Sequence, residues 1–265
     1  MIKQTIRLRL WRWTIISAVG LYLLVPLYAM FDFSTKPFGF EDKGRTFRAW
    51  QIIPSQPDLF VAISRSLVTA AIVMAFILFL VVPTAIWVHL KLPLLRRPFE
   101  LLCLLPLAIP AIVIVVGIAP LYRWISINVS ESPITLAGVY SILILPYTYR
   151  SLSAALDAVD INTLAEAART LGASTMHMIF GIIMPTIKTG IVNGSFIAIA
   201  LVLGEYTISN ILNFKTFQVV IAQIGRSNGN VAVAVSLASL LFVLVLLLII
   251  PTKKRRSEIL DVDIA

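Results

Sequence analysis

The chain has 265 residues, of which 59% are hydrophobic and only 13% are charged, and its formal net charge is +9. Soluble domains average about 25% charged residues, so this composition excludes an ordinary soluble globular protein. The positive charge does not indicate nucleic-acid binding, because the basic residues lie in short clusters between apolar runs, as in membrane proteins that use them to set orientation. We therefore expect an integral membrane protein that contacts lipid and has no nucleic-acid partner.

Six apolar runs are long enough to cross a bilayer. A hydrocarbon core about 30 Å thick needs about 20 mostly apolar residues in a helix. Transmembrane β-strands would alternate over about ten residues, whereas these runs are continuous. The sequence therefore predicts an all-α membrane protein with six transmembrane helices in one domain over residues 14–252. The predicted spans cover residues 14–32, 62–89, 99–122, 134–157, 190–212 and 231–251.

The N-terminal basic residues precede the first run as they would in a signal peptide. The run is long, however, Pro26 interrupts it, and no small-x-small cleavage site follows. We therefore expect residues 1–13 to form a short arm before an uncleaved first helix. With this arm in the cytoplasm, the inner segments carry 14 Lys and Arg residues and the outer segments carry 7, with Arg65 inside the second span. The positive-inside rule then places both termini in the cytoplasm, including a tail over residues 253–265.

Prolines are frequent within the predicted spans or at their ends. Each removes a backbone donor and kinks its helix unless neighbouring groups compensate. Such helices suit a bundle that lines a pathway, although ordinary irregularity of membrane helices is the better explanation for any single proline. The residues concerned are Pro26, Pro83, Pro106, Pro110, Pro120 and Pro146.

The longest predicted cytoplasmic loop covers residues 158–189, and its first half predicts a short helix. Thr163, followed three residues later by Glu166, has the pattern of a capping box, in which the hydroxyl and the carboxylate each satisfy a free amide. Glu166 is also favourably placed near the positive end of the helix dipole. Leucines and alanines continue the helix, and Gly172 ends it in the left-handed conformation.

The second half of the loop predicts another short helix. Ser174 is its expected cap, Pro185 ends it, and an apolar stripe is formed by Met176, Ile179 and Phe180. The loop is therefore expected to be a helix-turn-helix on the cytoplasmic surface, where small alanine side chains allow another protein to approach closely. An amphipathic hairpin that lies in the membrane interface without a partner remains an alternative at this point.

The spacing of this loop resembles the EAA loop of binding-protein-dependent ATP-binding-cassette (ABC) importer permeases. The match consists of Glu166-Ala167-Ala168, three residues, Gly172, nine residues, and Ile182-Ile183-Met184-Pro185. The family has leucine where Met184 stands, which is a volume-conserving difference. Other stretches are similar too, so that the resemblance covers about residues 60 to 252: Ser66-Leu67, Leu105 to Val113, and Leu203-Gly-Glu-Tyr206.

The resemblance implies a type I importer permease (MetI-like) bundle in a bacterial inner membrane. It also implies that the loop docks on a cytoplasmic ATPase dimer, which moves the bundle between inward-open and outward-open states. The residues expected to make this contact or set its geometry are Glu166, Ala167, Ala168, Gly172, Ile182 and Pro185. The chain has no G-x-x-x-x-G-K-[ST] motif, so ATP and Mg are expected on the separate ATPase, and this subunit is not expected to be an enzyme.

Further partners follow from the same resemblance. A working importer is expected to need a second permease subunit, either the same or a homologous chain, and a periplasmic or lipid-anchored solute-binding protein. Among relatives, the chain most resembles importers of polyamines, phosphonates, and iron or thiamine, followed by sulfate and molybdate permeases. A membrane scaffold or exporter component is an alternative, as is an ion-coupled secondary transporter, although no inverted repeat or second deep carboxylate supports the latter.

Polar residues within the fifth span are candidates for a translocation pathway. Glu205 lies about fifteen residues into this span, and a carboxylate at that depth must face the bundle interior or a cavity. It either lines the pathway or ties helices together through Arg65 or Arg123. Ser209 and Asn213 follow it by four and eight residues and are expected on the same face of the helix. Further candidates are Tyr206 and Asn193, and Tyr147 in the fourth span.

Other reactive side chains carry no assigned chemistry. Tyr140 and Tyr147 are explained at least as well by an interfacial aromatic belt. Cys103 lies in an apolar run and is expected to be a buried hydrophobe, and neither histidine has the company of metal ligands. Asp157 and Asp160 are expected to be solvated loop charges. The chain itself is therefore expected to bind neither cofactor nor metal.

Overall fold

The computed structural model describes residues 2–37 and 44–262, and within these ranges the regular structure is helical. Residue 1, residues 38–43 and residues 263–265 lie outside the described residues, including the expected outer cation Lys43 and the end of the expected tail. The chain divides into two compact units. We call Met1–Pro57 with Ile221–Ala265 the terminal unit, and Asp58–Val220 the central unit.

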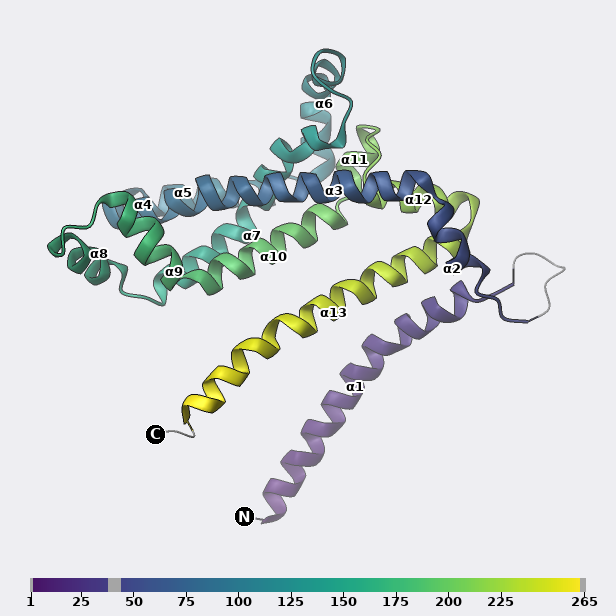
Figure 1. Cartoon of the computed structure of the whole chain (residues 1–265), viewed down its shortest axis with the longest axis horizontal. Coiled ribbons are helices and arrows are strands. Elements are labelled where there is room, and N and C mark those ends of the chain that lie inside the picture. Colours follow the sequence, from purple (N-terminus) through teal and green to yellow (C-terminus); the bar gives the residue numbers. More distant parts are fainter. Residues whose placement is uncertain (1, 38–43, 263–265) are drawn as a thin grey trace. The chain divides into compact units, whose positions relative to one another are not determined.

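The terminal unit is built from the two ends of the chain. Its helix α1 contacts α13, and α13 also contacts α2, so that the three converge near α2 (Figure 1). Helix α12 begins in the central unit and ends in this one. The bounds are α1 Ile2–Ser34, α2 Arg48–Ile52, a 3₁₀ turn Ile53–Ser55, α12 Phe217–Ser227 and α13 Gly229–Val262. The expected tail is therefore helical as far as Val262.

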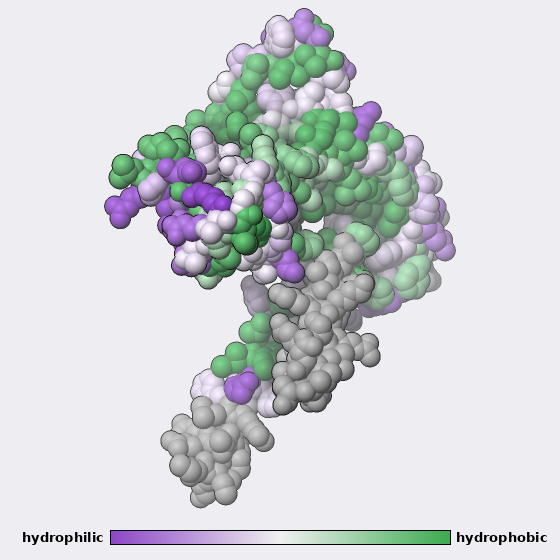
Figure 2. All heavy atoms as spheres, turned by 60° about the vertical axis from the view of Figure 1, so that its left-hand side comes forward, coloured by the Kyte–Doolittle hydropathy of each residue, from purple (hydrophilic) through white to green (hydrophobic). Residues whose placement is uncertain are grey.

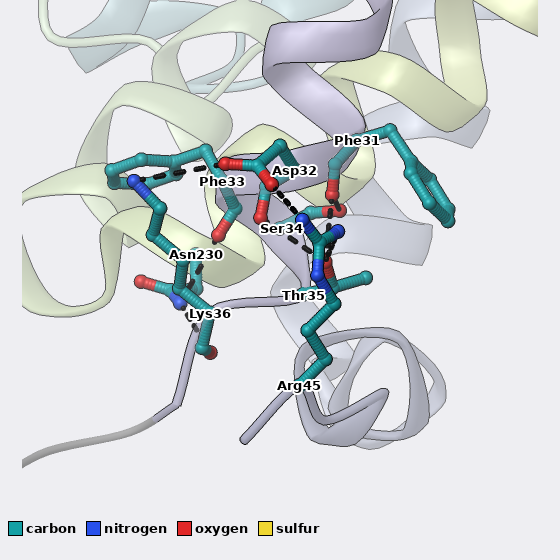
Figure 3. Close-up of polar contacts among 8 residues, drawn as sticks. All are labelled: Phe31, Asp32, Phe33, Ser34, Thr35, Lys36, Arg45 and Asn230. Atoms are coloured by element: carbon teal, nitrogen blue, oxygen red, sulfur yellow. Dashed lines mark hydrogen bonds and ion pairs between the residues drawn. The ribbon is translucent and has the colours of Figure 1, made fainter. Parts of the chain in front are cut away.

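A polar cluster fastens the end of α1 to the start of α13 (Figure 3). The Asn230 side chain donates hydrogen bonds to the Phe33 and Lys36 carbonyl oxygens, at 3.3 and 3.0 Å. Asp32 forms ion pairs with Arg45 and, at 3.8 Å, with Lys36 (Figure 3). The Asn230 amide thus links carbonyl groups at the end of α1 and just beyond it to the first turn of α13.

The central unit contains the rest of the helices. Its first helix, α3, continues through a π-helical turn into α4, which makes one run over Pro57–Lys91. Helix α6 stands away from the helices α3, α7 and α10 (Figure 1). The bounds are α3 Pro57–Phe76, η2 Ile77–Val81, α4 Val82–Lys91, η3 Pro93–Leu95, α5 Arg96–Leu104, η4 Leu105–Ala108, α6 Ala111–Asn128, η5 Pro133–Leu136, α7 Ala137–Asp157, α8 Ile161–Thr170, η6 His177–Ile183, α9 Met184–Thr186, α10 Lys188–Gly204 and α11 Thr207–Ile211.

Among the described residues, four helical segments are long and apolar enough to cross a membrane: Trp11–Ser34, Pro57–Lys91, Ala111–Asn128 and Lys188–Ile211. The fourth and sixth expected spans overlap α7, of 21 residues, and α13, of 34 residues. A helix of 21 residues is about 31 Å long, close to the thickness of the hydrocarbon core. The all-α membrane fold is thus confirmed, and the count of six spans stays a prediction.

The third span was expected as one helix over residues 99–122, and that expectation is wrong. Helix α5 ends at Leu104, a 3₁₀ turn follows, Ile109 is extended, and α6 begins at Ala111. Pro106 and Pro110 explain the interruption. Proline supplies no amide for the helix ladder, and it disfavours the helical conformation of the residue before it.

Helices α7 and α10 pack closely along small residues. Gly190 and Gly194 lie four residues apart on α10 and are both buried. A Cβ atom built on Gly190 would meet the Ala155 Cβ atom at 2.3 Å and the Ser151 carbonyl oxygen at 2.9 Å. The Ser151 hydroxyl donates to the Gly190 carbonyl at 2.9 Å. This arrangement is typical of membrane helices, where small residues let backbones approach and hydroxyls bond between helices.

Large apolar side chains are widespread on the surface of the described residues. In Figure 2 hydrophobic atoms cover much of the visible face, and hydrophilic atoms gather on the forward end, where α8 lies. Helices α3, α5 and α6 all carry such exposed side chains, for example Leu67, Leu101 and Val116. A surface of this kind is stable against lipid or against other apolar helices but not against water.

Candidate functional site

We use the name coupling segment for residues Ile161–Thr186, which connect α7 to α10. The segment consists of α8, the π-helical η6 and the short α9. Helix α8 packs against η6 and against α4. It lies at one end of the central unit, away from α6 and α11 (Figure 1).

Helix α8 begins three residues earlier than its sequence predicts. Its cap is Asp160, whose carboxylate accepts the Thr163 amide at 3.2 Å and the Thr163 hydroxyl at 2.6 Å. The expected capping box of Thr163 and Glu166 is therefore wrong, and so is the expectation that Asp160 is merely a solvated charge. Aspartate caps helices as well as threonine does, so the sequence contains two possible cap residues for α8, Asp160 and Thr163. The hydrogen bonds from the Thr163 side chain and amide lower the pKa of Asp160.

The C-terminal end of α8 has the geometry that the sequence predicts. Gly172 is left-handed, with φ of +79°. Its amide donates to the Arg169 carbonyl at 2.9 Å, and the next amide, of Ala173, donates to the Ala168 carbonyl at 3.0 Å. These two bonds together form a Schellman motif, which favours glycine at the left-handed position.

The second half of the coupling segment is capped as expected but buries a different face. The Ser174 hydroxyl accepts the His177 amide at 3.2 Å. The expected stripe is wrong in two of its three members, because Met176 and Phe180 are exposed. The wider π-helical turn of η6 changes which residues share a face, and the buried ones are Met178, Ile179 and Ile183.

The residues expected to contact a partner lie on different sides of the segment. Glu166, Ala167, Gly172 and Pro185 are exposed, Ile182 is half-buried, and Ala168 is buried. Ala168 therefore serves the packing of α8 and is not available for contact. Leu171 was not singled out from the sequence, yet its side chain is 87% exposed beside Gly172. The segment thus presents the Glu166 carboxylate and Ala167 on the exposed face of α8, and the apolar Leu171 side chain at its C-terminal end.

The second candidate site lies at the end of α10, where the helix breaks. Glu205 was expected within a continuous helix, but α10 ends at Gly204 and Glu205 is extended, with φ of −74° and ψ of 125°. A new short helix, α11, begins at Thr207. Ser209 and Asn213 consequently do not share a helix face with Glu205, and that expectation is wrong.

The Glu205 carboxylate holds this break together. It accepts the Ile208 amide at 2.7 Å and the Ser209 amide and hydroxyl, both at 3.2 Å. The Tyr140 hydroxyl of α7 donates to it at 2.7 Å. Among the described basic residues, including the expected Arg65 and Arg123, none forms an ion pair with it.

Tyr140 was expected in an interfacial belt, and that expectation is wrong, because its side chain is 2% exposed and bonded to Glu205. Nothing in the sequence indicates this pairing, since the two residues are 65 positions apart.

A cavity of about 270 Å³ opens beside the break. Its lining includes Glu205 and Tyr147, two of the candidates from the sequence, and also Tyr140. Among the described residues that line it, Glu205 is the one with a charged side chain. The lining comprises Pro106, Leu107, Ile109, Ala111, Tyr140, Leu143, Ile144, Tyr147, Leu201, Val202, Glu205 and Ile208.

The other four expected pathway residues do not line this cavity. Tyr206 lies in the break itself, and Asn193 is exposed on α10. Ser209 is buried and accepts a hydrogen bond from Thr216 at 2.9 Å. Asn213 is left-handed, with φ of 62°, and ends α11 in the way that Gly172 ends α8. Ser209 and Asn213 therefore shape the chain around the cavity.

Comparisons with known proteins agree with one another on the kind of protein. The family model described as "Binding-protein-dependent transport system inner membrane component" matches residues 81–252. The molybdenum transport system permease protein ModB of Escherichia coli (strain K12) is 35% identical over 86 residues, which cover 32% of this chain and 37% of ModB. The spermidine/putrescine permease protein PotB of Haemophilus influenzae is 33% identical over 83 residues, covering 31% of this chain and 28% of PotB.

A solved structure shares the fold over most of the chain. It belongs to a bacterial ABC transporter involved in the import of the acidic polysaccharide alginate. The TM-score is 0.67 at 14% sequence identity, and the alignment covers 90% of this chain and 93% of the other. The similarity therefore extends to the fold as a whole, although the sequences have diverged.

Proposed function

Because this chain belongs to the family of binding-protein-dependent inner-membrane transport components, we propose that it is the permease subunit of an ABC importer. In this proposal it provides a path into the cell for a small solute, and a separate ATPase supplies the energy. The observation that carries the proposal is the coupling segment. Helix α8, which is followed by the left-handed Gly172, presents Glu166, Ala167 and Leu171 as exposed side chains.

The partner of this helix is proposed to be a cytoplasmic ABC ATPase dimer. Exposed apolar and small side chains on a short helix suit a groove on another protein, because little side-chain entropy is lost when they dock. Helix α8 packs on α4, the end of the run Pro57–Lys91, and follows α7 after three residues, so a displacement of α8 would be transmitted to both. Nucleotide binding on the ATPase would then shift the bundle between two states.

The cavity at Glu205 is proposed to be part of the solute pathway. Its two phenols and single carboxylate offer hydrogen bonds inside an otherwise apolar wall. The resemblance to PotB, named for spermidine and putrescine, supports a polyamine, and the resemblance to ModB, named for molybdenum, adds an oxyanion. Phosphonates and iron or thiamine complete the proposed substrate classes.

The assembly and location follow from the same proposal. The importer would contain a second permease, of this or a homologous chain, and would receive its solute from a periplasmic or lipid-anchored binding protein. The chain would cross the bacterial inner membrane several times, with both termini in the cytoplasm. ATP and Mg would bind to the ATPase and not to this subunit.

The Gly172→Val variant of the assembled transporter tests the proposal. An L-residue in the left-handed conformation costs roughly 1–2 kcal/mol, and the bulk at Cβ adds to it, so the turn should lose its shape. We expect ATP hydrolysis to continue while uptake of the solute falls, with the protein still present in the membrane. Uptake in cells and ATPase activity of the purified complex measure the two quantities separately.

Gly117→Val is the matched control, because Gly117 lies on α6 without positive φ and has no atom within 4 Å of a built Cβ. It should leave the ratio of uptake to hydrolysis unchanged. Normal uptake by Gly172→Val would contradict the coupling proposal. Uptake that survives ATP depletion but stops with an ionophore would instead indicate an ion-coupled transporter.

A further inference from the structure

One face of α7 carries a row of polar side chains where the helix approaches the coupling segment. Tyr149, Ser153 and Asp157 follow one another at intervals of four residues, which places them on the same side of the helix. The Tyr149 ring packs edge-on against Phe99 of α5, with 5.5 Å between ring centroids. Asp157 is the last residue of α7. The row therefore leads from the interior of the central unit to the start of the coupling segment.

Asp157 joins the ends of three helices. Its carboxylate forms an ion pair with Arg96, the first residue of α5, and accepts the Ser153 hydroxyl at 3.4 Å. The Nε2 atom of His89, in the last turn of α4, lies 3.7 Å from the same carboxylate. That distance is too long for a hydrogen bond. The ends of α4, α5 and α7 thus meet at one carboxylate, which at present engages α5.

Two buried polar atoms in these helices lack hydrogen-bond partners among the described residues: His89 Nε2 at the junction, and the Tyr149 hydroxyl about two turns further back along α7. The His89 side chain is 5% exposed, and its Nδ1 atom faces the Ala85 carbonyl at 3.1 Å. A carbonyl only accepts, so Nδ1 carries the hydrogen and a neutral ring leaves Nε2 as an acceptor. Asp157 cannot satisfy it, whereas the Arg96 guanidinium has donors to spare.

Unsatisfied buried groups are rare in folded proteins, and each calls for an explanation. At the junction the unsatisfied atom is His89 Nε2, which lies 3.7 Å from the carboxylate that pairs with Arg96, so that a turn of the Arg96 guanidinium from Asp157 towards His89 would satisfy it. A polar junction with two arrangements is the kind of element through which a movement at one site biases another.

We propose that Asp157 and Arg96 are positioning residues that fasten the coupling segment to the start of α5. The inference rests on the proposed function, since it concerns how movement of α8 reaches the bundle. Only residues 158–160 separate Asp157 from α8, and the last of them caps that helix. Movement of α8 therefore pulls on Asp157 directly, and through Arg96 it moves α5 together with α7.

The test compares uptake with ATP hydrolysis in the complete transporter carrying Asp157→Asn. Asparagine keeps the size of the side chain but removes the charge that holds Arg96. Mutations in coupling elements change coupling severalfold, so we expect solute transported per ATP hydrolysed to fall roughly 3- to 10-fold. The side chains of Arg96 and Asp157 are 37% and 49% exposed, and such pairs stabilise a fold little, so the variant should still assemble.

Two further variants separate positioning from simple stabilisation. The charge-swapped pair Arg96→Asp with Asp157→Arg restores attraction across the junction and should recover much of the lost ratio. Asp58→Asn removes an exposed pair of the same kind, between Asp58 and Lys215 at 3.4 Å, and should leave the ratio unchanged.

The outcomes distinguish this inference from the proposed function. An unchanged ratio in Asp157→Asn, or no recovery in the swapped pair, would overturn the inference and leave the importer assignment intact. Failure of Asp157→Asn to assemble, while Asp58→Asn assembles, would also overturn it by showing a purely structural role. A wild-type complex without ATP-dependent uptake would instead refute the proposed function.

Discussion

Replacing Gly190 by alanine probes the close approach of α7 and α10. The added Cβ atom would lie 2.3 Å from the Ala155 Cβ atom and 2.9 Å from the Ser151 carbonyl oxygen. Both are far below an ordinary van der Waals distance, and one of them is backbone that cannot turn aside. Helices α7 and α10 must therefore move apart, and the bond from the Ser151 hydroxyl to the Gly190 carbonyl lengthens with them.

The cost follows from three contributions. Forcing an extra methyl group into a packed interface costs about 1–3 kcal/mol. A hydrogen bond between membrane helices adds about 0.6 kcal/mol when it is lost. The higher helix propensity of alanine offsets up to about 1 kcal/mol of this loss of stability. Gly194→Ala gains the same propensity, but its new Cβ meets its neighbours at an ordinary 3.6 Å. The difference between the two variants should therefore be about 1.5–3.5 kcal/mol.

Reversible unfolding of the purified protein in mixed detergent micelles measures this difference, with loss of helical circular dichroism as the signal. Gly190→Ala should unfold at a lower fraction of denaturing detergent than the wild type, and Gly194→Ala should unfold at the same fraction or a higher one. Equal stability of the two variants, or the reverse order, would refute the close approach of α7 and α10 at Gly190.

Two other predictions concern the caps of short helices. Asp160→Ala should speed amide hydrogen exchange in α8, because the Thr163 amide loses its acceptor. Folding lowers the pKa of Asp160, so its stabilisation of α8 is complete above the ordinary pKa near 3.8 and is lost as the pH falls through the lower pKa of the folded state. Hydrogen exchange of the α8 amides, measured at a series of decreasing pH values, would detect this loss. Tyr140→Phe should cost only about 1 kcal/mol in the same unfolding assay, because Glu205 keeps three other donors, whereas Glu205→Ala should cost more by leaving the Ile208 and Ser209 amides unpaired.

The sequence predicts features that depend on local rules. Continuous apolar runs predict membrane helices because a bilayer leaves the backbone no other partner. The left-handed Gly172 and the Ser174 cap were also predictable, because each depends only on residues within a few positions along the chain. The start of α8 was not, because Asp160 and Thr163 are both good cap residues and the sequence offers a capping pattern at each.

Features that depend on two distant segments were not predictable from one sequence. The bond between Tyr140 and Glu205 joins α7 to the end of α10, and neither residue has a neighbour that indicates the other. The packing at Gly190 and Gly194 does have a sequence signal, which is a pair of glycines four residues apart within an apolar run. The π-helical turn that redirects Met178 and Phe180 has no comparable signature.

The two interrupted helices of the central unit border the same cavity. The first break lies between α5 and α6, at Pro106 and Ile109, and the second lies between α10 and α11, at Glu205. Non-helical backbone at membrane depth is tolerated where it is buried in protein or lines a hydrated cavity, because lipid cannot satisfy its amides and carbonyls. Because the two helix breaks line the same cavity, a common role in forming that cavity explains them better than two unrelated distortions of the helices. Continuous lipid contact along α5–α6 and α10–α11, as reported by spin labels at Leu107 and Leu201, would contradict that explanation and with it the pathway proposed at Glu205.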